Sequence, residues 1–307
     1  ESDTGIETTI LENRKHKHFT IASDGSLLAI MSYNDIEDSK KAEKEFDSNF
    51  NVNYLLLIKN DLTEYIFCKK DIGTGKILRL RKKKENLETA FLNKLEELEF
   101  DSFEIFEKIF DRSELIKDFY RLYCDCEKYV IKNIKGIPNE KEKEFFAKLL
   151  IERLMFLWFL QKKGFLNNDL KYLISKYTII SQNNNYYNEF INKLFFSGLC
   201  KKDTERTEDI KILLGNIPYL NGGLFIESEI ELAYGSMIQI SNEIFYRKEI
   251  TYPISSEENN IPILNLFESK EWTIDERSGE VDKINPEILG YIFEKSINQK
   301  DLGAVYT

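Results

Sequence analysis

The sequence predicts an α+β protein in which a small mixed α/β domain precedes a mainly α-helical domain. Apolar residues alternate with the strand period of two up to about residue 86, and they recur at helical spacing after it. The length of 307 residues exceeds what one hydrophobic core usually organises, which favours more than one domain. We therefore expect domains at residues 1–95 and 96–300, with residues 301–307 beginning another.

Five short runs in the first domain have the character of strands, and turn residues separate them. The runs span residues 18–22, 26–33, 53–59, 64–69 and 76–80. The turn signals are Asp24-Gly25, Asn60-Asp61 and Gly73-Thr74-Gly75, which predict hairpins. Charged residues 35–47 form either a helix or a long loop that crosses over between strands.

Two long helices are predicted at the start of the second domain. Residues 113–130 carry one apolar stripe at helical spacing. The next helix begins after Pro138, because Asn139 can accept hydrogen bonds from the first-turn amides, and it ends at Gly164. Its residues 149–160 leave almost no polar face, so we expect this helix at the centre of the core.

Shorter elements complete the second domain. Residues 186–199 predict an aromatic-rich helix, and residues 201–209 a solvated loop. Residues 217–225 place a turn with permissive backbone angles between two apolar anchors. Asn285 can cap a last helix that has Pro286 at its first position.

The composition limits the classes of function. A formal net charge of -10 argues against autonomous nucleic-acid binding, which needs clustered cations. The four cysteines lack the paired spacing of a zinc site, so free thiols in a cytoplasmic protein are the simpler interpretation. The longest apolar stretch is too short to span a bilayer. Both ends of the chain look cut, and we expect a fragment of a longer protein.

No catalytic residue and no metal ligand is predicted. The histidines, His16 and His18, lie near no nucleophile motif, which excludes a serine hydrolase triad. The stretch Gly73-Thr74-Gly75-Lys76 lacks the spacing of a phosphate-binding loop and indicates a hairpin turn. A metal-dependent nuclease would need carboxylates and a lysine that converge from strands. Asp24 with Asp38-Ser39-Lys40 fits that pattern poorly, and solvated carboxylates are the favoured interpretation.

One basic segment stands out in this acidic chain. Arg79, Arg81, Lys82, Lys83 and Lys84 lie almost consecutively and are the candidate DNA-binding residues. Each phosphate that they neutralise would add affinity through counterion release. The alternative is a strand end that runs into a solvated linker, because no aromatic residues flank the segment. With this net charge, we expect DNA binding to be weak and non-specific at most.

Three stretches carry a resemblance to a known family. They read RLMFLWFLQKKGFL at residues 153–166, YLNGGLF at residues 219–225, and NPEILGYIFE at residues 285–294, followed by GAVYT at residues 303–307. In this order they resemble the type IIG restriction–modification family, including related large phage-exclusion methyltransferases. These polypeptides join an endonuclease, a helical connector, an N6-adenine DNA methyltransferase and a target-recognition domain.

The resemblance implies a fragment that ends where the methyltransferase domain begins. The parent would use S-adenosyl-L-methionine as cofactor and double-stranded DNA as partner, in phage defence. Tyr306 and Thr307 match a family segment that borders the cofactor pocket. The glycine-rich cofactor motif and the NPPY motif that holds a flipped adenine are both absent from the 307 residues, so we expect this fragment to bind no cofactor tightly and to be catalytically incomplete.

The helical domain would then act as a structural connector to the downstream methyltransferase and target-recognition domains. Residues 1–95 match the family only loosely, in the place of a nuclease-like or accessory domain. The alternative is a non-enzymatic helical scaffold, or an acidic protein that mimics the charge of DNA.

Overall fold

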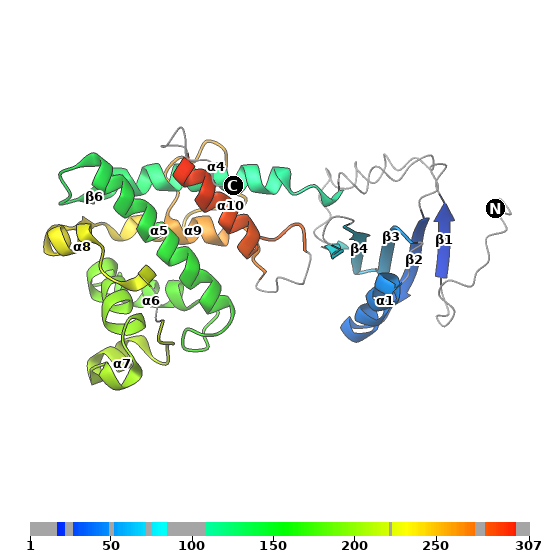
Figure 1. Cartoon of the computed structure of the whole chain (residues 1–307), viewed down its shortest axis with the longest axis horizontal. Helices are drawn as coiled ribbons and strands as arrows, with labels where there is room; N and C mark the ends of the chain where they lie inside the picture. Colours follow the sequence, from blue (N-terminus) through cyan, green and yellow to red (C-terminus); the bar gives the residue numbers. More distant parts are fainter. Residues whose placement is uncertain are drawn as a thin grey trace. The chain divides into compact units, whose positions relative to one another are not determined.

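The computed structural model describes residues 17–21, 27–48, 52–71, 75–84, 109–220, 223–273 and 280–298, and it confirms the α+β fold. The chain divides into two compact units. The first comprises residues 1–115 and 275–283, and the second comprises residues 116–274 and 284–307. Strands gather in the first unit, and the long helices lie in the second (Figure 1).

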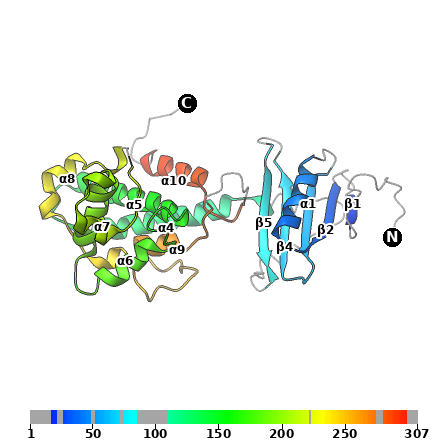
Figure 2. The same ribbon diagram turned by 90° about the horizontal axis from the view of Figure 1, so that it is seen from below.

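A five-stranded sheet forms the first unit, in the order β1-β2-β3-β4-β5. The strands are β1 (Lys17–Ile21), β2 (Leu27–Tyr33), β3 (Tyr54–Lys59), β4 (Glu64–Lys70) and β5 (Ile77–Lys83). Neighbours are antiparallel except β2 and β3, which are parallel because α1 (Ile36–Ser48) crosses over between them (Figure 2). The five predicted strands are confirmed, and the charged residues after β2 form a helix.

Both faces of this sheet are covered by apolar side chains. Phe46 and Ala42 of α1 pack with buried residues of one face, among them Met31 and Leu55. Because successive strand residues point to opposite faces, the residues next to Met31 and Leu55 in sequence lie on the face away from α1. There a second cluster gathers Leu28, Tyr54, Phe67, Leu80, Ile109, Phe110 and Val281.

A late segment of the chain pairs with β5. The amide of Val281 donates to the carbonyl of Arg79 at 2.9 Å, and Glu280 forms a parallel bridge with the same residue. Asp282 lies 3.3 Å from the Lys82 ammonium. Burial raises the pKa of the Asp282 carboxyl, and Lys82 opposes that rise. This segment, residues 280–282, is named the edge segment because it completes the β5 side of the sheet.

Three long helices frame the second unit: α4 (Ser113–Asn133), α5 (Glu140–Lys162) and α10 (Pro286–Asn298). The predicted caps are confirmed. The Asn139 side chain accepts from the amides of Lys141 at 2.9 Å and Glu142 at 3.3 Å. The Asn285 side chain accepts from the amide of Ile288 at 2.9 Å. These bonds satisfy donors that a helix start leaves unpaired.

The central helix of the second unit is α5, as predicted. Trp158 is buried, with ring centroids 5.5 Å from Phe267 of α9 (Ile263–Glu268) and 6.4 Å from Trp272. Its neighbour Phe156 is an exception to the expected burial, since 40% of it is exposed. The helix therefore leaves part of one face uncovered within the described residues.

Short helices fill the remainder of the second unit. They are α6 (Tyr172–Ile180), α7 (Glu208–Leu214), α8 (Glu229–Tyr234) and the π-helical turns η2 (Tyr187–Ile191) and η3 (Leu194–Leu199). A two-stranded ladder joins β6 (Ile134–Lys135) to β7 (Gln239–Ile240). The solvated loop expected at residues 201–209 is exposed at every residue except Arg206. A 3-10 turn, η4 (Asp203–Glu205), lies there, and Arg206 is buried because its guanidinium satisfies backbone carbonyls.

Trp158→Ala should lower the free energy of unfolding of the second unit by about 3–5 kcal/mol, because it removes buried aromatic surface and leaves a cavity. Urea denaturation of the intact chain measures this loss. In a Trp272→Phe background, the Trp158 emission should be blue-shifted and poorly quenched by iodide. A red-shifted, readily quenched emission would contradict the burial of this side chain.

Candidate functional site, a segment held by two buried arginines

The segment between α7 and α8 combines an irregular backbone with unusually strong internal support. Residues 217–226 are named the clamped segment, of which residues 221 and 222 lie outside the described part. Tyr219 and Ile226 expose their side chains, whereas Ile217 and Phe225 are buried anchors. The expected apolar anchors on both sides of the turn are thus confirmed.

Arg153 of α5 holds the end of the clamped segment. Its Nε donates to the carbonyl of Leu224 at 2.6 Å, and a terminal nitrogen donates to the carbonyl of Ile226 at 2.7 Å. The guanidinium carbon lies 5.3 Å from the ring centroids of both Phe195 and Phe196. Cation–π contacts of this kind contribute more when the cation is desolvated. Arg153 therefore joins the first two motif stretches in space.

Glu231 completes the Arg153 site from α8. Its Oε1 accepts from the other terminal nitrogen of Arg153 at 2.6 Å, and both side chains are buried. Its Oε2 accepts from the amide and the hydroxyl of Ser228, each at 2.8 Å. The Ser228 hydroxyl in turn caps the amide of Glu231, which forms a capping box. One carboxylate thus neutralises Arg153 and fixes the start of α8.

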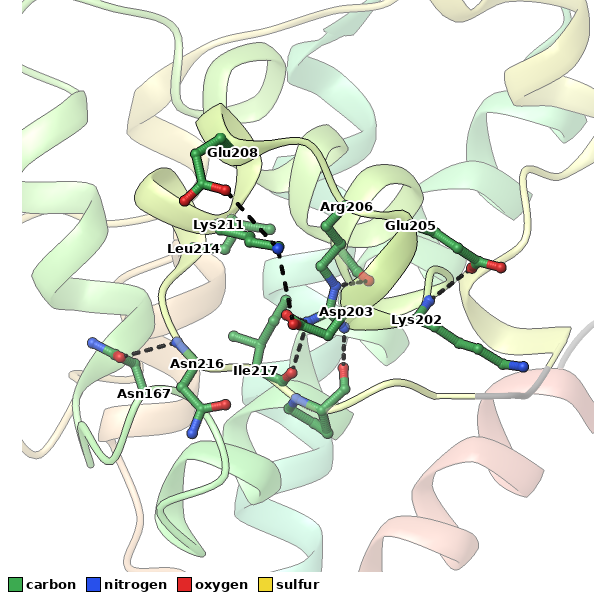
Figure 3. Close-up of polar contacts among 12 residues, drawn as sticks. Asn167, Lys202, Asp203, Glu205, Arg206, Glu208, Lys211, Leu214, Asn216 and Ile217 are labelled. Atoms are coloured by element: carbon green, nitrogen blue, oxygen red, sulfur yellow. Dashed lines mark hydrogen bonds and ion pairs between the residues drawn. The ribbon is translucent and has the colours of Figure 1, made fainter.

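Arg206 holds the beginning of the clamped segment (Figure 3). Its terminal nitrogens donate to the carbonyls of Ile217 and Pro218, both at 2.9 Å. Its Nε donates to the carbonyl of Gly198 at 3.0 Å, near the end of η3, where a helix leaves carbonyls unpaired. Asp203 lies 3.6 Å from the guanidinium and is mostly exposed. Two arginines from distant parts of the sequence therefore fix the two ends of one segment.

Gly198 is closely packed beside the side chains of Leu214 and Ile217. A Cβ atom at Gly198 would lie 2.5 Å from Leu214 Cδ1 and 2.8 Å from Ile217 Cδ1. The middle of the clamped segment is held separately, because the amide of Leu220 donates to the carbonyl of Leu199 at 2.8 Å. A larger side chain at residue 198 would have to displace the side-chain ends of Leu214 and Ile217.

Arg153 and Arg206 support the backbone of the clamped segment. The guanidinium nitrogens of Arg153 and Arg206 already donate to backbone carbonyls and a carboxylate of the protein. The described residues contain no group of three or more His, Cys, Asp or Glu side chains that could hold a metal ion. Within the same residues, no helix combines the length and the apolar character that crossing a membrane requires.

The predicted DNA-binding residues lie at the end of β5, but alternation divides them between the two faces of the sheet. Arg79 and Arg81 are on the α1 face, where Arg79 donates to Glu43 at 2.7 Å and Arg81 to Glu64 at 2.6 Å. The phenol of Tyr33 lies near Glu64 on that face, and burial followed by this carboxylate raises its pKa to about 12.

The remaining cations of the segment differ in exposure. Lys82 points to the opposite face from Arg81 and pairs with Asp282. Lys83 and Lys84 are exposed, and neither forms an ion pair within the described part of the chain. Carboxylates therefore partly neutralise three of the five candidate residues, namely Arg79, Arg81 and Lys82. Although the five residues are close in sequence, they do not form one continuous basic patch on the surface.

The other candidate residues, Tyr306 and Thr307, lie outside the described residues. Sequence reasoning noticed Arg153 only as the start of a motif and missed Arg206 as a structural residue. A charged side chain within an otherwise apolar helix was a usable signal for Arg153, because such a residue is buried only with partners. The sequence around Arg206 contains no comparable signal.

The sequence of this chain is similar to that of a restriction–modification protein. A curated protein of Methanocaldococcus jannaschii, named "Putative type II restriction enzyme and methyltransferase", is 30% identical over 328 aligned residues. The alignment covers 99% of this chain and 25% of that protein, so the chain spans about a quarter of the length of its curated relative. Residues 129–267 match a domain of unknown function, DUF7814. No solved structure matches the chain.

Arg153→Ala should destabilise the second unit by about 3–5 kcal/mol, because it leaves the buried Glu231 carboxylate and two carbonyls without their partner. Lys193→Ala is the matched control, since the Lys193–Glu189 pair is exposed and such pairs contribute about 0.3–0.5 kcal/mol. Chemical denaturation of both variants compares the two losses. Equal losses would show that the Arg153 site does not hold the clamped segment.

Proposed function

We propose that this chain forms part of a DNA restriction–modification enzyme, in which its second unit is a structural connector. The observation that carries the proposal is the similarity over nearly the whole chain to the relative named as a restriction enzyme and methyltransferase. The match extends over both compact units and is not confined to one motif. The chain would contribute architecture to the parent enzyme and would not be catalytically complete by itself.

The more specific part of the proposal is a type IIG parent. That enzyme would be a site-specific N6-adenine DNA methyltransferase joined to an endonuclease, with S-adenosyl-L-methionine as cofactor and double-stranded DNA as partner. The three motif stretches support it, and the first two lie in direct contact through Arg153. The third stretch begins with Asn285, which caps α10.

A connector has to keep a cleavage domain and a methylation domain at a fixed geometry on one DNA molecule. Rigid elements whose rotamers are locked by packing and by supporting hydrogen bonds meet that need better than mobile loops. In the second unit, α5 supplies the buried axis, and Arg153 and Arg206 fix the irregular clamped segment against it. This is the physical support for the connector role.

The test compares the whole gene product with the chain of 307 residues. The whole product should transfer methyl groups from labelled S-adenosyl-L-methionine to adenine in DNA, and the chain alone should not. Isothermal titration should give no binding of the cofactor to the chain beyond a marginal level. A gene that stops directly after Thr307, or methyl transfer by the chain alone, would contradict this function.

The second candidate is a non-enzymatic scaffold or an acidic DNA mimic, which the net charge of -10 favours. A DNA mimic would bind basic DNA-binding proteins and compete with DNA for them. Competition of the chain with an oligonucleotide for such a protein distinguishes this candidate from the connector.

Lys83→Ala/Lys84→Ala should weaken any DNA binding of the chain and reduce the slope of its salt dependence by up to about 1.8, which is about 0.9 for each lost phosphate contact. Replacing Arg81, Lys82, Lys83 and Lys84 together with alanine should abolish it. The control is Lys128→Ala, an exposed lysine on α4. Binding titrations at several salt concentrations provide the measurement, and unchanged binding by the fourfold variant would refute a role of the basic segment.

A further inference from the structure

The basic segment has a carboxylate neighbour that comes from a distant part of the sequence. Asp282 of the edge segment accepts a hydrogen bond from the Lys82 ammonium at 3.3 Å, across a separation of 200 residues. The next two residues after Lys82, which are Lys83 and Lys84, are exposed. The fold therefore brings one carboxylate to the first of three consecutive lysines.

Backbone pairing and burial hold the edge segment beside β5. The amide of Val281 donates to the carbonyl of Arg79 at 2.9 Å, and Glu280 forms a parallel bridge with Arg79. The Val281 side chain is 3% exposed and packs in the apolar cluster on the sheet face away from α1. Because none of these contacts uses the Asp282 carboxylate, they fix its position independently of its ion pair.

The charges around the edge segment leave one carboxylate in excess. Glu280 lies 2.6 Å from the ammonium of Lys283, so these two charges offset each other. Residues 280–283 carry two carboxylates and one ammonium, which gives a net charge of -1. The Lys82 and Asp282 side chains are 23% and 32% exposed. Ion pairs that solvent reaches in this way are weak, so another anion can displace the carboxylate.

A phosphate that approaches Lys82 competes with this carboxylate. A lysine contributes to DNA affinity because the phosphate that it neutralises releases counterions. The contribution is smaller at a lysine that is already paired, because the existing pair has to be broken first. Lys83 and Lys84 differ from Lys82 in this respect, since both are exposed. The number of phosphates that the basic segment neutralises therefore depends on where Asp282 lies.

We propose that the edge segment is an autoinhibitory element, in which Asp282 occupies Lys82 and lowers the affinity of the basic segment for DNA phosphates. The proposal rests on the proposed function, in which double-stranded DNA is the partner. With the edge segment in place, Lys83 and Lys84 contact phosphates. Lys82 adds its own contact only after Asp282 has left it.

Asp282→Asn tests this proposal, because it removes the negative charge and keeps the size of the side chain. Burial raises the pKa of the Asp282 carboxyl, so its surroundings should tolerate an uncharged amide. Fluorescence anisotropy of a fluorescein-labelled DNA duplex with the intact chain should show tighter binding than for the wild type. One additional phosphate contact should steepen the salt dependence by about 0.9, a further loss of about 3.5-fold in affinity between roughly 50 and 200 mM salt.

Two further variants separate the local ion pair from net charge. Glu37→Gln changes the net charge as much as Asp282→Asn does, but Glu37 is an exposed residue of α1 that pairs with Lys41. It should keep the wild-type salt dependence. Lys82→Ala/Asp282→Asn has the wild-type net charge and should bind DNA like the wild type, because the ammonium that Asp282→Asn releases is absent. Circular dichroism should show an unchanged fold for all three variants.

The inference is overturned if Asp282→Asn keeps the wild-type salt dependence, if Glu37→Gln gains the same affinity, or if Lys82→Ala/Asp282→Asn keeps the gain. In each case the proposed function stands as long as Lys83→Ala/Lys84→Ala weakens DNA binding. Absence of DNA binding by both the wild type and Asp282→Asn also overturns the inference. Methyl transfer by the whole gene product then decides the proposed function separately.

Discussion

The buried Arg153–Glu231 pair is the interaction on which the second unit depends most. The Arg153 guanidinium lies over two phenylalanine rings, and its nitrogens donate to two carbonyls and one carboxylate. A cation can be removed from water at tolerable cost only when its donors are satisfied. Arg153 therefore requires a backbone that presents carbonyls at defined positions, and this requirement determines the path of the clamped segment.

The regular parts of the fold were predictable because they depend on local patterns. The strand period located β1 to β5 closely, and Asn139 and Asn285 marked the first turns of α5 and α10. The capping hydrogen bonds join residues two or three positions apart, so they can be predicted from the local sequence. The sequence was less decisive for α1, because its charged residues also allowed a loop.

The candidate site was much less predictable, because its contacts are long-range. Arg153 meets carbonyls more than seventy positions later in the chain, with separations of 71 and 73 residues. Arg206 lies in a polar stretch that resembles a solvated loop, and only the tertiary fold brings the carbonyls of Gly198, Ile217 and Pro218 around it. The basic run was visible in the sequence. The alternation of side chains along β5 and the ion pairs with Glu43, Glu64 and Asp282 were not, and they determine how many of its cations are exposed and unneutralised.

The edge segment is synthesised long after the strand with which it pairs, so the sheet cannot be completed when β5 first forms. Lys82 and Asp282 are separated by 200 residues, so β5 acquires this neighbour only after 200 further residues have been synthesised. At a synthesis rate of roughly 5–20 residues per second, the interval is about 10–40 s. During that time the nascent sheet has an unpaired strand edge, which is a template for aggregation. Charged side chains on an edge strand disfavour such pairing, and Lys83 at the end of β5 and Lys84 directly after it are exposed.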